Sequence, residues 1–192
     1  DSEGVRTFYL IDNTSALYPT LTPIPYPKVG ETNSASRVGI VSATSGPTRW
    51  LEVPGDPRNH YIARMSWAES SEEIVLQQLN RLQNTNLVML GDIRTGKVRT
   101  ILPDRDDAWV DIHGDEILWL DGGKRFLWVS ERDGWRHAYG VSRDGASFKL
   151  ITPGDFDLIS VEGVDESGGS LYFIASPDNP TQRYLYRASL DG

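Results

Sequence analysis

Cysteine is absent from this chain of 192 residues. Disulfides, thiolate zinc sites and a cysteine nucleophile are therefore excluded. The chain also lacks an apolar stretch near the ~20 residues that a membrane-spanning helix needs. No cluster of Lys and Arg occurs, and 27 acidic against 19 basic residues give a net charge of −8. This balance argues against nucleic acid or an anionic membrane surface as a partner.

Aromatic and turn-forming residues are plentiful. The chain has six Trp and eight Tyr together with 18 Gly and 11 Pro. Hydrophobic residues make up 39% and charged residues 24%, which is typical of a globular rather than a disordered protein. Many short strands joined by tight turns fit this composition. The expected fold class is therefore all-β.

An internal repeat organises the chain. Four segments share an apolar strand, a short turn that ends in glycine, and in three cases a similar second strand. The turn glycines are Gly46, Gly96, Gly145 and Gly192, with spacings of 50, 49 and 47 residues. Glycine supplies the positive φ of a tight hairpin turn. A repeat of ~40–50 residues built from four antiparallel strands is the blade of a β-propeller.

The repeat predicts a partial β-propeller of about four four-stranded antiparallel blades or fewer. We expect approximate blades at residues 1–60 (partial), 61–109, 110–158 and 159–192 (partial). The character of both chain ends suggests a fragment of a larger protein.

Two segments leave alternatives. Residues 70–82 fit a helix with Ser71 as N-cap and Leu76, Leu79 and Leu82 on one side. A strand and turn is the preferred interpretation, because the repeat aligns this segment with a hairpin about 49 residues later.

The proline-rich residues 18–30 are expected to form an extended connector rather than a central strand, because proline removes a backbone donor.

Several motifs carry a resemblance to a known family. Residues 26–30 have the sequence Tyr-Pro-Lys-Val-Gly, with Asn33 shortly after. This segment resembles the Tyr-Pro-Lys-x-Gly-x-x-Asn signature of dipeptidyl peptidase IV and its relatives in the prolyl oligopeptidase superfamily. Residues 67–68 and 76–84 are similar to that family's Trp-Ala and Leu-Gln-x-Leu-x-Arg-x-Gln-Asn segments. Residues 130–137, Ser-Glu-Arg-Asp-Gly-Trp-Arg-His, resemble its bacterial members.

The resemblance implies an eight-bladed propeller packed against an α/β-hydrolase domain. Such a hydrolase removes dipeptides with Pro or Ala in second position from peptide N-termini. The implied partners are the missing blades, the hydrolase domain and a peptide substrate, and a homo-oligomer is also expected. A periplasmic or secreted location follows if the source is bacterial. The alternative is a propeller used as a protein-interaction module with no active peptidase attached.

The chain itself lacks the machinery of a serine hydrolase. No Gly-x-Ser-x-Gly elbow occurs in the sequence. His60, His113 and His137 fall at expected strand ends or turns, and their spacing does not suit a metal pair. We therefore predict no catalytic residue, no metal and no cofactor in this chain, and structural or surface roles for the histidines.

Acidic pairs bear on substrate binding, because the resembled family holds the substrate's amino group with two adjacent glutamates. Glu72 and Glu73 are adjacent, but they lack the matching motif context. We expect them on a solvated hairpin turn, with the functional pair upstream of this sequence.

Trp109 and Val110 are the candidate substrate-binding residues. The resembled family places Trp-Val after a blade's last strand, followed by residues that line the extended peptide site. The Arg-Phe that follows in some relatives is replaced here, since residues 111–113 are Asp-Ile-His. The alternative, which we favour from sequence, is that Trp109 packs between blades. For Arg132 we expect an ion pair with a carboxylate of a neighbouring blade.

Overall fold

The computed structural model describes residues 1–112 and 117–192, which form fifteen strands joined by turns. Within these residues there is no helix, and so none that is long and apolar enough to cross a membrane. The all-β prediction is confirmed.

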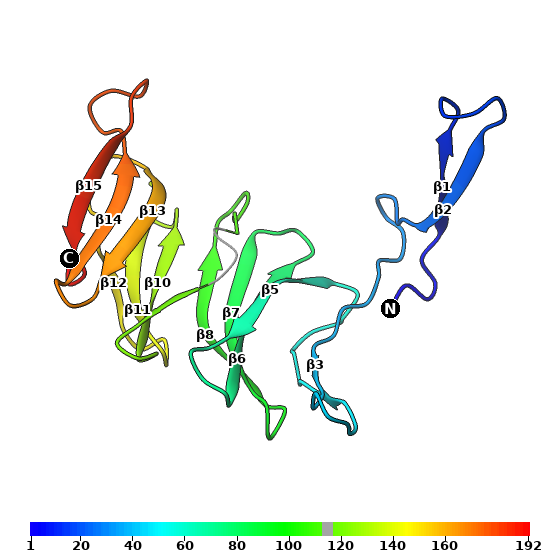
Figure 1. Ribbon diagram of the computed structural model, residues 1–192, viewed down its shortest axis with the longest axis horizontal. Coiled ribbons are helices and arrows are strands. Elements are labelled where there is room, and N and C mark those ends of the chain that lie inside the picture. Colours follow the sequence, from blue (N-terminus) through cyan, green and yellow to red (C-terminus); the bar gives the residue numbers. More distant parts are fainter. Residues whose placement is uncertain (113–116) are drawn as a thin grey trace.

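The strands form antiparallel sheets that follow one another across the molecule in chain order (Figure 1). Sheet A consists of β5 (His60–Trp67), β6 (Glu73–Asn80), β7 (Thr85–Asp92) and β8 (Val98–Arg105). Sheet B consists of β9 (Leu118–Leu120), β10 (Arg125–Ser130), β11 (His137–Ser142) and β12 (Phe148–Leu150). Sheet C consists of β13 (Leu158–Asp165), β14 (Ser170–Ala175) and β15 (Tyr184–Ser189). Two pairs precede them, β1 (Thr7–Asp12) with β2 (Thr20–Pro25), and β3 (Gly39–Ile40) with β4 (Arg49–Trp50).

Strand β6 resolves the ambiguity of residues 70–82 in favour of the preferred interpretation. It is a middle strand, paired with β5 and β7, and both of its faces are buried. Val75 packs toward sheet B, whereas Leu76 packs toward β3 and β4. A strand that is covered on both faces has a continuous apolar run instead of alternation. The helical spacing of its leucines is a by-product of that run.

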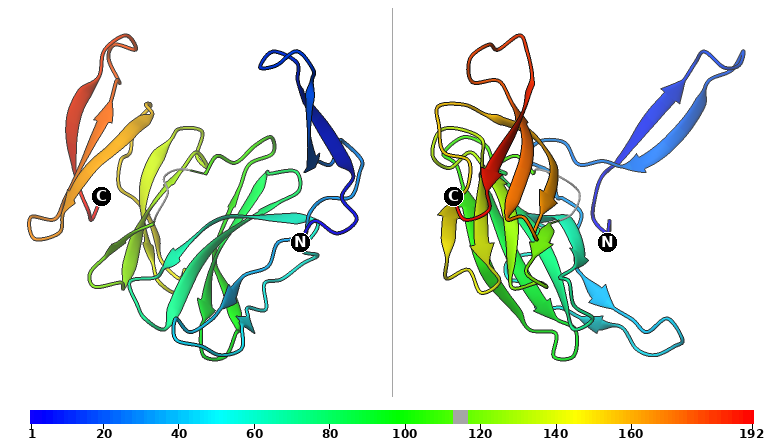
Figure 2. Two further views of the ribbon diagram at one scale, coloured as in Figure 1. Left: turned by 45° about the vertical axis from the view of Figure 1, so that its right-hand side comes forward. Right: turned by 60° about the vertical axis from the view of Figure 1, so that its left-hand side comes forward.

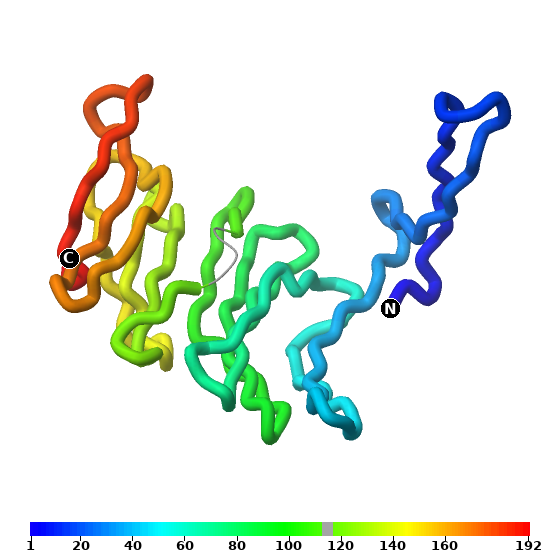
Figure 3. The backbone as a smooth tube through the Cα atoms, viewed as in Figure 1, coloured from blue at the N-terminus to red at the C-terminus, as the bar shows by residue number. Residues whose placement is uncertain are grey.

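The proline-rich segment differs from its expectation. Residues 20–25 form strand β2, in register with β1 from Thr7 opposite Pro25 to Asp12 opposite Thr20. Proline is tolerated because a two-stranded ribbon has only edge strands, whose outward side needs no donor. The hairpin projects away from the row of sheets (Figure 2), and the chain path places the two termini at opposite ends of that row (Figure 3).

The hydrophobic core is divided among the interfaces between neighbouring sheets. One cluster lies between sheets A and B and includes Val88, Leu90, Phe126 and Trp128. A second lies between sheets B and C and includes Leu127, Leu158 and Phe173. A third joins the β3–β4 pair to sheet A. Each sheet is thus stabilised by burial against its neighbours in the chain.

Three of the four repeat glycines, Gly96, Gly145 and Gly192, mark points where one sheet touches the next, whereas a Cβ added at Gly46 would have no neighbouring atom within 4 Å. Gly145 has φ +76°, and a Cβ at this position would lie 1.8 Å from the carbonyl oxygen of Ile101 on β8. The same contact recurs at the other joints. A Cβ at Gly96 would lie 2.9 Å from Trp50 O, and one at Gly192 would lie 2.7 Å from Leu150 O. The glycine is therefore required by the close approach as well as by the turn.

Arg143 forms a second joint between sheets A and B. Its Nη2 lies 2.7 Å from Glu73 Oε2, and its Nη1 donates to Ala68 O at 2.8 Å. The guanidinium also lies 4.7 Å from the centre of the Trp119 ring. The expectation of a solvated turn was wrong for Glu73, because its side chain is only 24% exposed and pairs with an arginine of the next sheet.

Candidate functional site

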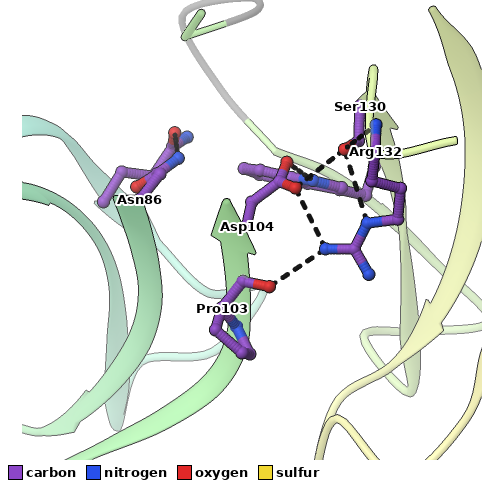
Figure 4. Close-up of polar contacts among 7 residues, drawn as sticks. Asn86, Pro103, Asp104, Ser130 and Arg132 are labelled. Atoms are coloured by element: carbon purple, nitrogen blue, oxygen red, sulfur yellow. Dashed lines mark hydrogen bonds and ion pairs between the residues drawn. The ribbon is translucent and has the colours of Figure 1, made fainter. Parts of the chain in front are cut away.

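A buried carboxylate, Asp104 near the end of β8, is the centre of a polar cluster between sheets A and B (Figure 4). Asp104 is 4% exposed. Its Oδ2 accepts a hydrogen bond from Trp128 Nε1 at 2.8 Å, and its Oδ1 accepts one from Ser130 Oγ at 2.8 Å. These contacts fix the end of β10 against β8.

Arg132 compensates the charge of Asp104. Its Nη2 donates to Asp104 Oδ1 at 3.0 Å and to Pro103 O at 2.9 Å, as Figure 4 shows. The guanidinium also lies 4.1 Å from the centre of the Phe148 ring. The expected pairing of Arg132 with a carboxylate of a neighbouring blade is confirmed. Such a charge-assisted contact orders the segment that follows β10.

A groove lies beside this cluster. One wall is formed by residues 106–111, which we call the Trp109 loop, and the other by the segment that follows β10. The lining residues are Asp104, Arg105, Asp106, Trp109, Val110, Asp111, Ser130, Glu131 and Arg132. Both sequence-predicted binding residues, Trp109 and Val110, therefore lie at the same groove.

The Trp109 loop is held by its own hydrogen bonds. Asp106 Oδ1 accepts from the amides of Ala108 at 2.7 Å and Trp109 at 3.2 Å. These two hydrogen bonds lower the pKa of Asp106. The indole Nε1 of Trp109 donates to Asp111 Oδ1 at 2.9 Å. The loop thus has a defined shape without a regular element.

Trp109 and Val110 differ in exposure. Trp109 is 52% exposed, whereas Val110 is 8% exposed. In this structure the indole is presented at the groove instead of packing between two blades. Val110 anchors the loop, and the Trp109 side chain is half exposed.

Negative charge gathers at the groove. The pKa of Glu131 is raised by partial burial and then by the negative charges of Asp111 and Asp157. Arg105 and Arg132 are the two cations among the lining residues.

The described histidines are buried and hydrogen-bonded. His60 Nδ1 lies 2.8 Å from Gln78 Nε2. His137 Nδ1 lies 2.9 Å from Asp133 Oδ2, and its Nε2 lies 2.9 Å from Gly154 O. His113 lies outside the described residues. Residues 1–112 and 117–192 contain no group of three or more His, Cys, Asp or Glu that could hold a metal ion.

Sequence reasoning missed Asp104 as the centre of the cluster. Its partners Trp128 and Ser130 lie 24 and 26 residues away along the chain. In the sequence, Asp104 directly follows Pro103 near the expected end of a strand. This pattern predicted where the strand ends, and it did not predict the partners of Asp104. A pairing across two sheets has no local sequence pattern.

The profile of the family described as "Dipeptidyl peptidase IV (DPP IV) N-terminal region" matches residues 1–192. The chain belongs to the dipeptidyl peptidase IV N-terminal family. The resemblance inferred from the sequence motifs is confirmed.

Curated relatives and solved structures agree with this family. The chain is 29% identical to mouse "Inactive dipeptidyl peptidase 10", covering 93% of this chain and 24% of the relative. It is 27% identical to "Probable dipeptidyl peptidase 4" of Emericella nidulans, covering 97% and 26%. The crystal structure of Porphyromonas gingivalis dipeptidyl peptidase 4 superposes with a TM-score of 0.82 at 28% identity, over 96% of this chain and 26% of that one.

A second structure supports the fold alone. A putative dipeptidyl aminopeptidase IV from Bacteroides ovatus gives a TM-score of 0.84 at 22% identity, covering 100% of this chain and 29% of that one. The chain spans about a quarter of the length of these relatives. The partial β-propeller predicted from the repeat is confirmed.

Proposed function

We propose that this chain is the non-catalytic propeller segment of a serine exopeptidase of the dipeptidyl peptidase IV type. In the full-length protein the remaining blades and an α/β-hydrolase domain complete the enzyme. That enzyme removes Xaa-Pro or Xaa-Ala dipeptides from peptide N-termini. The propeller segment gates access of the peptide, and Trp109 contacts it.

One observation supports the contact role of Trp109. Its indole is half exposed, yet its loop is fixed by the side chain of Asp106 and by Asp111. An aromatic side chain that is already ordered loses little conformational entropy when a ligand packs against it. Ordered and exposed aromatics of this kind are frequent at binding sites.

The test compares substrates of two lengths in the full-length protein. Trp109→Ala should raise KM for peptides that extend beyond the cleaved dipeptide, and it should leave a dipeptidyl chromogenic substrate almost unchanged. Tyr18→Ala is the matched control, because Tyr18 is an aromatic side chain that is 80% exposed on the β1–β2 hairpin. Equal effects of the two variants would contradict the proposed contact.

The absence of a nucleophile from this segment is tested separately. A fluorophosphonate probe should label a serine of the full-length protein outside these 192 residues and should leave the isolated chain unlabelled. Stoichiometric labelling of one serine within the chain would overturn the non-catalytic assignment.

A second candidate function is a protein-interaction propeller whose hydrolase domain is inactive or absent. Two relatives, from mouse and rat, are named "Inactive dipeptidyl peptidase 10" and are each 29% identical to this chain. The full-length sequence separates the two candidates. A downstream Gly-x-Ser-x-Gly with later Asp and His favours the peptidase, and loss of any of the three favours the interaction module.

A further inference from the structure

The turn between β6 and β7 lies against the Trp109 loop. The amide of Val110 donates to Gln83 O at 2.9 Å, and the amide of Asp106 donates to Asn84 O at 3.2 Å. Two consecutive carbonyls of one turn therefore hold both ends of the loop. The orientation of Trp109 depends on where these carbonyls point.

This turn contains an unfavourable backbone conformation. Gln83 has φ +57°, in the left-handed region that non-glycine residues seldom adopt. A backbone conformation of this kind persists only where surrounding contacts determine it. The contacts must therefore come from the turn's neighbours.

The side chain of Asn80 supplies them. Its Oδ1 accepts from the amides of Asn84 and Thr85, each at 3.1 Å. Its Nδ2 donates to Asn84 Oδ1 at 2.8 Å. The backbone adds one bond, from Gln83 N to Asn80 O at 3.0 Å. One amide side chain thus braces the turn from inside with three hydrogen bonds.

We infer that Asn80 is a positioning residue for Trp109: through the carbonyls of Gln83 and Asn84 it sets the placement of the loop that presents the indole. This positioning stands on the hydrogen bonds of the turn. Its consequence for catalysis rests on the proposed function, in which Trp109 contacts the substrate.

The chemistry of the brace predicts which substitutions matter. Asn80→Ala removes both acceptor and donor. Asn80→Asp keeps an acceptor for the two amides, and the Asn84 side chain can rotate to donate to the second carboxylate oxygen. Gln83→Gly keeps the carbonyl and removes the unfavourable φ. Only Asn80→Ala should release the loop.

The direct readout is the environment of the Trp109 indole. The full-length protein is labelled with 5-fluorotryptophan, and the ¹⁹F resonances of Trp109 and Trp128 are assigned by their disappearance in Trp109→Phe and Trp128→Phe. In Asn80→Ala the Trp109 resonance should shift and broaden while that of Trp128 stays in place. In Asn80→Asp the Trp109 resonance should lie at its wild-type position. This result would not be expected if Asn80→Ala acted only through a general loss of stability.

Two matched controls separate positioning from general destabilisation. Asn179 Oδ1 braces the turn before β15 by accepting from Thr181 N at 3.0 Å and Thr181 Oγ1 at 2.8 Å. Asn179→Ala therefore removes a similar brace far along the chain and should leave Trp109 unchanged. Gln83→Gly should also leave it unchanged. A Trp109 resonance that does not move in Asn80→Ala overturns the inference.

The kinetic measurement distinguishes this inference from the proposed function. If both hold, Asn80→Ala raises KM for longer peptides about three- to tenfold with kcat unchanged, the pattern expected for lost uniform binding. A shifted resonance with unchanged KM supports the positioning role and contradicts the substrate contact. If Asn80→Ala does not fold, Asn80→Leu, which has neither acceptor nor donor but fills a similar volume, is measured by the same resonance, and an unmoved Trp109 signal then overturns the inference.

Discussion

Asp104 shows how a buried charge is stabilised in this protein. Burial of a carboxylate is costly unless hydrogen bonds and an opposite charge compensate for lost hydration. Trp128 and Ser130 provide two donors, and Arg132 provides a third together with its charge. All three donors come from the next sheet, so the same contacts that satisfy the carboxylate also fasten sheet B to sheet A.

Asp104→Ala should lower the free energy of unfolding by about 2–4 kcal/mol, because it leaves a partly buried guanidinium and an indole N–H without their acceptor. Urea unfolding measures the change. Asp178→Ala removes an exposed carboxylate and should stay within about 0.5 kcal/mol of the wild type. Similar losses in the two variants would show that the cluster contributes nothing special.

The free energy of unfolding should depend on the ionisation of Glu131 in the opposite direction to that of a usual carboxylate, whose pKa is lowered by folding. Its pKa is raised in the folded protein by partial burial and by Asp111 and Asp157, so the folded state binds more protons than the unfolded state around the ordinary value of 4.5. The free energy of unfolding therefore falls as pH rises through this range.

Glu131→Gln removes the negative charge and should stabilise the protein at pH 7. The gain should be small, about 0.2–0.5 kcal/mol, since the carboxyl is largely exposed to solvent. It should vanish below about pH 4, where the native Glu131 is protonated as well. Thermal unfolding at both pH values measures it, and a gain that is equal at the two pH values would refute the electrostatic cause.

At the same residue scale, sequence reasoning reached the positions whose chemistry is local. Arg132 was predicted to pair across blades because it follows a strand in a charged turn, and Trp109 was located by its place after a strand. The partner of Arg132 could not be named, because Asp104 lies 28 residues earlier and meets it only when two sheets pack. The favoured packing role for Trp109 also depended on an interface that the sequence does not reveal.

At the scale of elements, the turn glycines Gly96, Gly145 and Gly192 have two separate functions. One is the positive φ that the hairpin requires. The other is the narrow space beside the last strand of the preceding sheet, which a side chain would fill. Substitutions can separate the two, because Gly122 also has a positive φ, +61°, but a Cβ added there would have no neighbouring atom within 4 Å.

Gly145→Ala should therefore destabilise the protein more than Gly122→Ala. We expect about 1–2 kcal/mol for Gly122→Ala from the backbone alone. For Gly145→Ala we expect about 3 kcal/mol or more, because the clash with Ile101 O adds to the backbone cost. Chemical unfolding of both variants gives the difference, and equal losses would mean that the joint relaxes without cost.

Elements with a strong repeat were predictable, and elements outside the repeat were not. The register of the glycines favoured a strand and turn for residues 70–82 despite the helical spacing of Leu76 and Leu79, and residues 73–80 form strand β6. No repeat covers residues 20–25, and their prolines argued for an extended connector rather than a central strand. The structure accommodates these prolines because β2 pairs only with β1. The outward edge of β2 has no partner strand and therefore needs no backbone N–H donor.

At the scale of the molecule, every sheet in the part of the chain that the structure describes ends in strands with one open edge. Strand β3 pairs with β4 alone, and β15 pairs with β14 alone. Beside β3, the side chains of Val41, Met65 and Trp67 are 59%, 64% and 57% exposed. Open edges and exposed apolar side chains favour pairing with other chains.

The isolated chain should therefore self-associate, as light scattering coupled to size-exclusion chromatography would show by a mass that rises with concentration. Met65→Lys should weaken the association by placing a charge beside the open edge. Leu82→Lys is the control, since Leu82 is 72% exposed but lies in the turn after β6. A single monomeric mass at high concentration would contradict the prediction.

The joints between sheets have a consequence for how such a protein can change over evolutionary time. Each joint places a glycine, which has no side chain, against a main-chain carbonyl, which every residue possesses. Neither the glycine nor the carbonyl is specific to one repeat, so this contact does not select one particular neighbour. A duplication or deletion of one whole repeat would recreate this glycine contact at the new boundary, whereas side-chain contacts such as those of Asp104 and Arg143 would have to evolve anew.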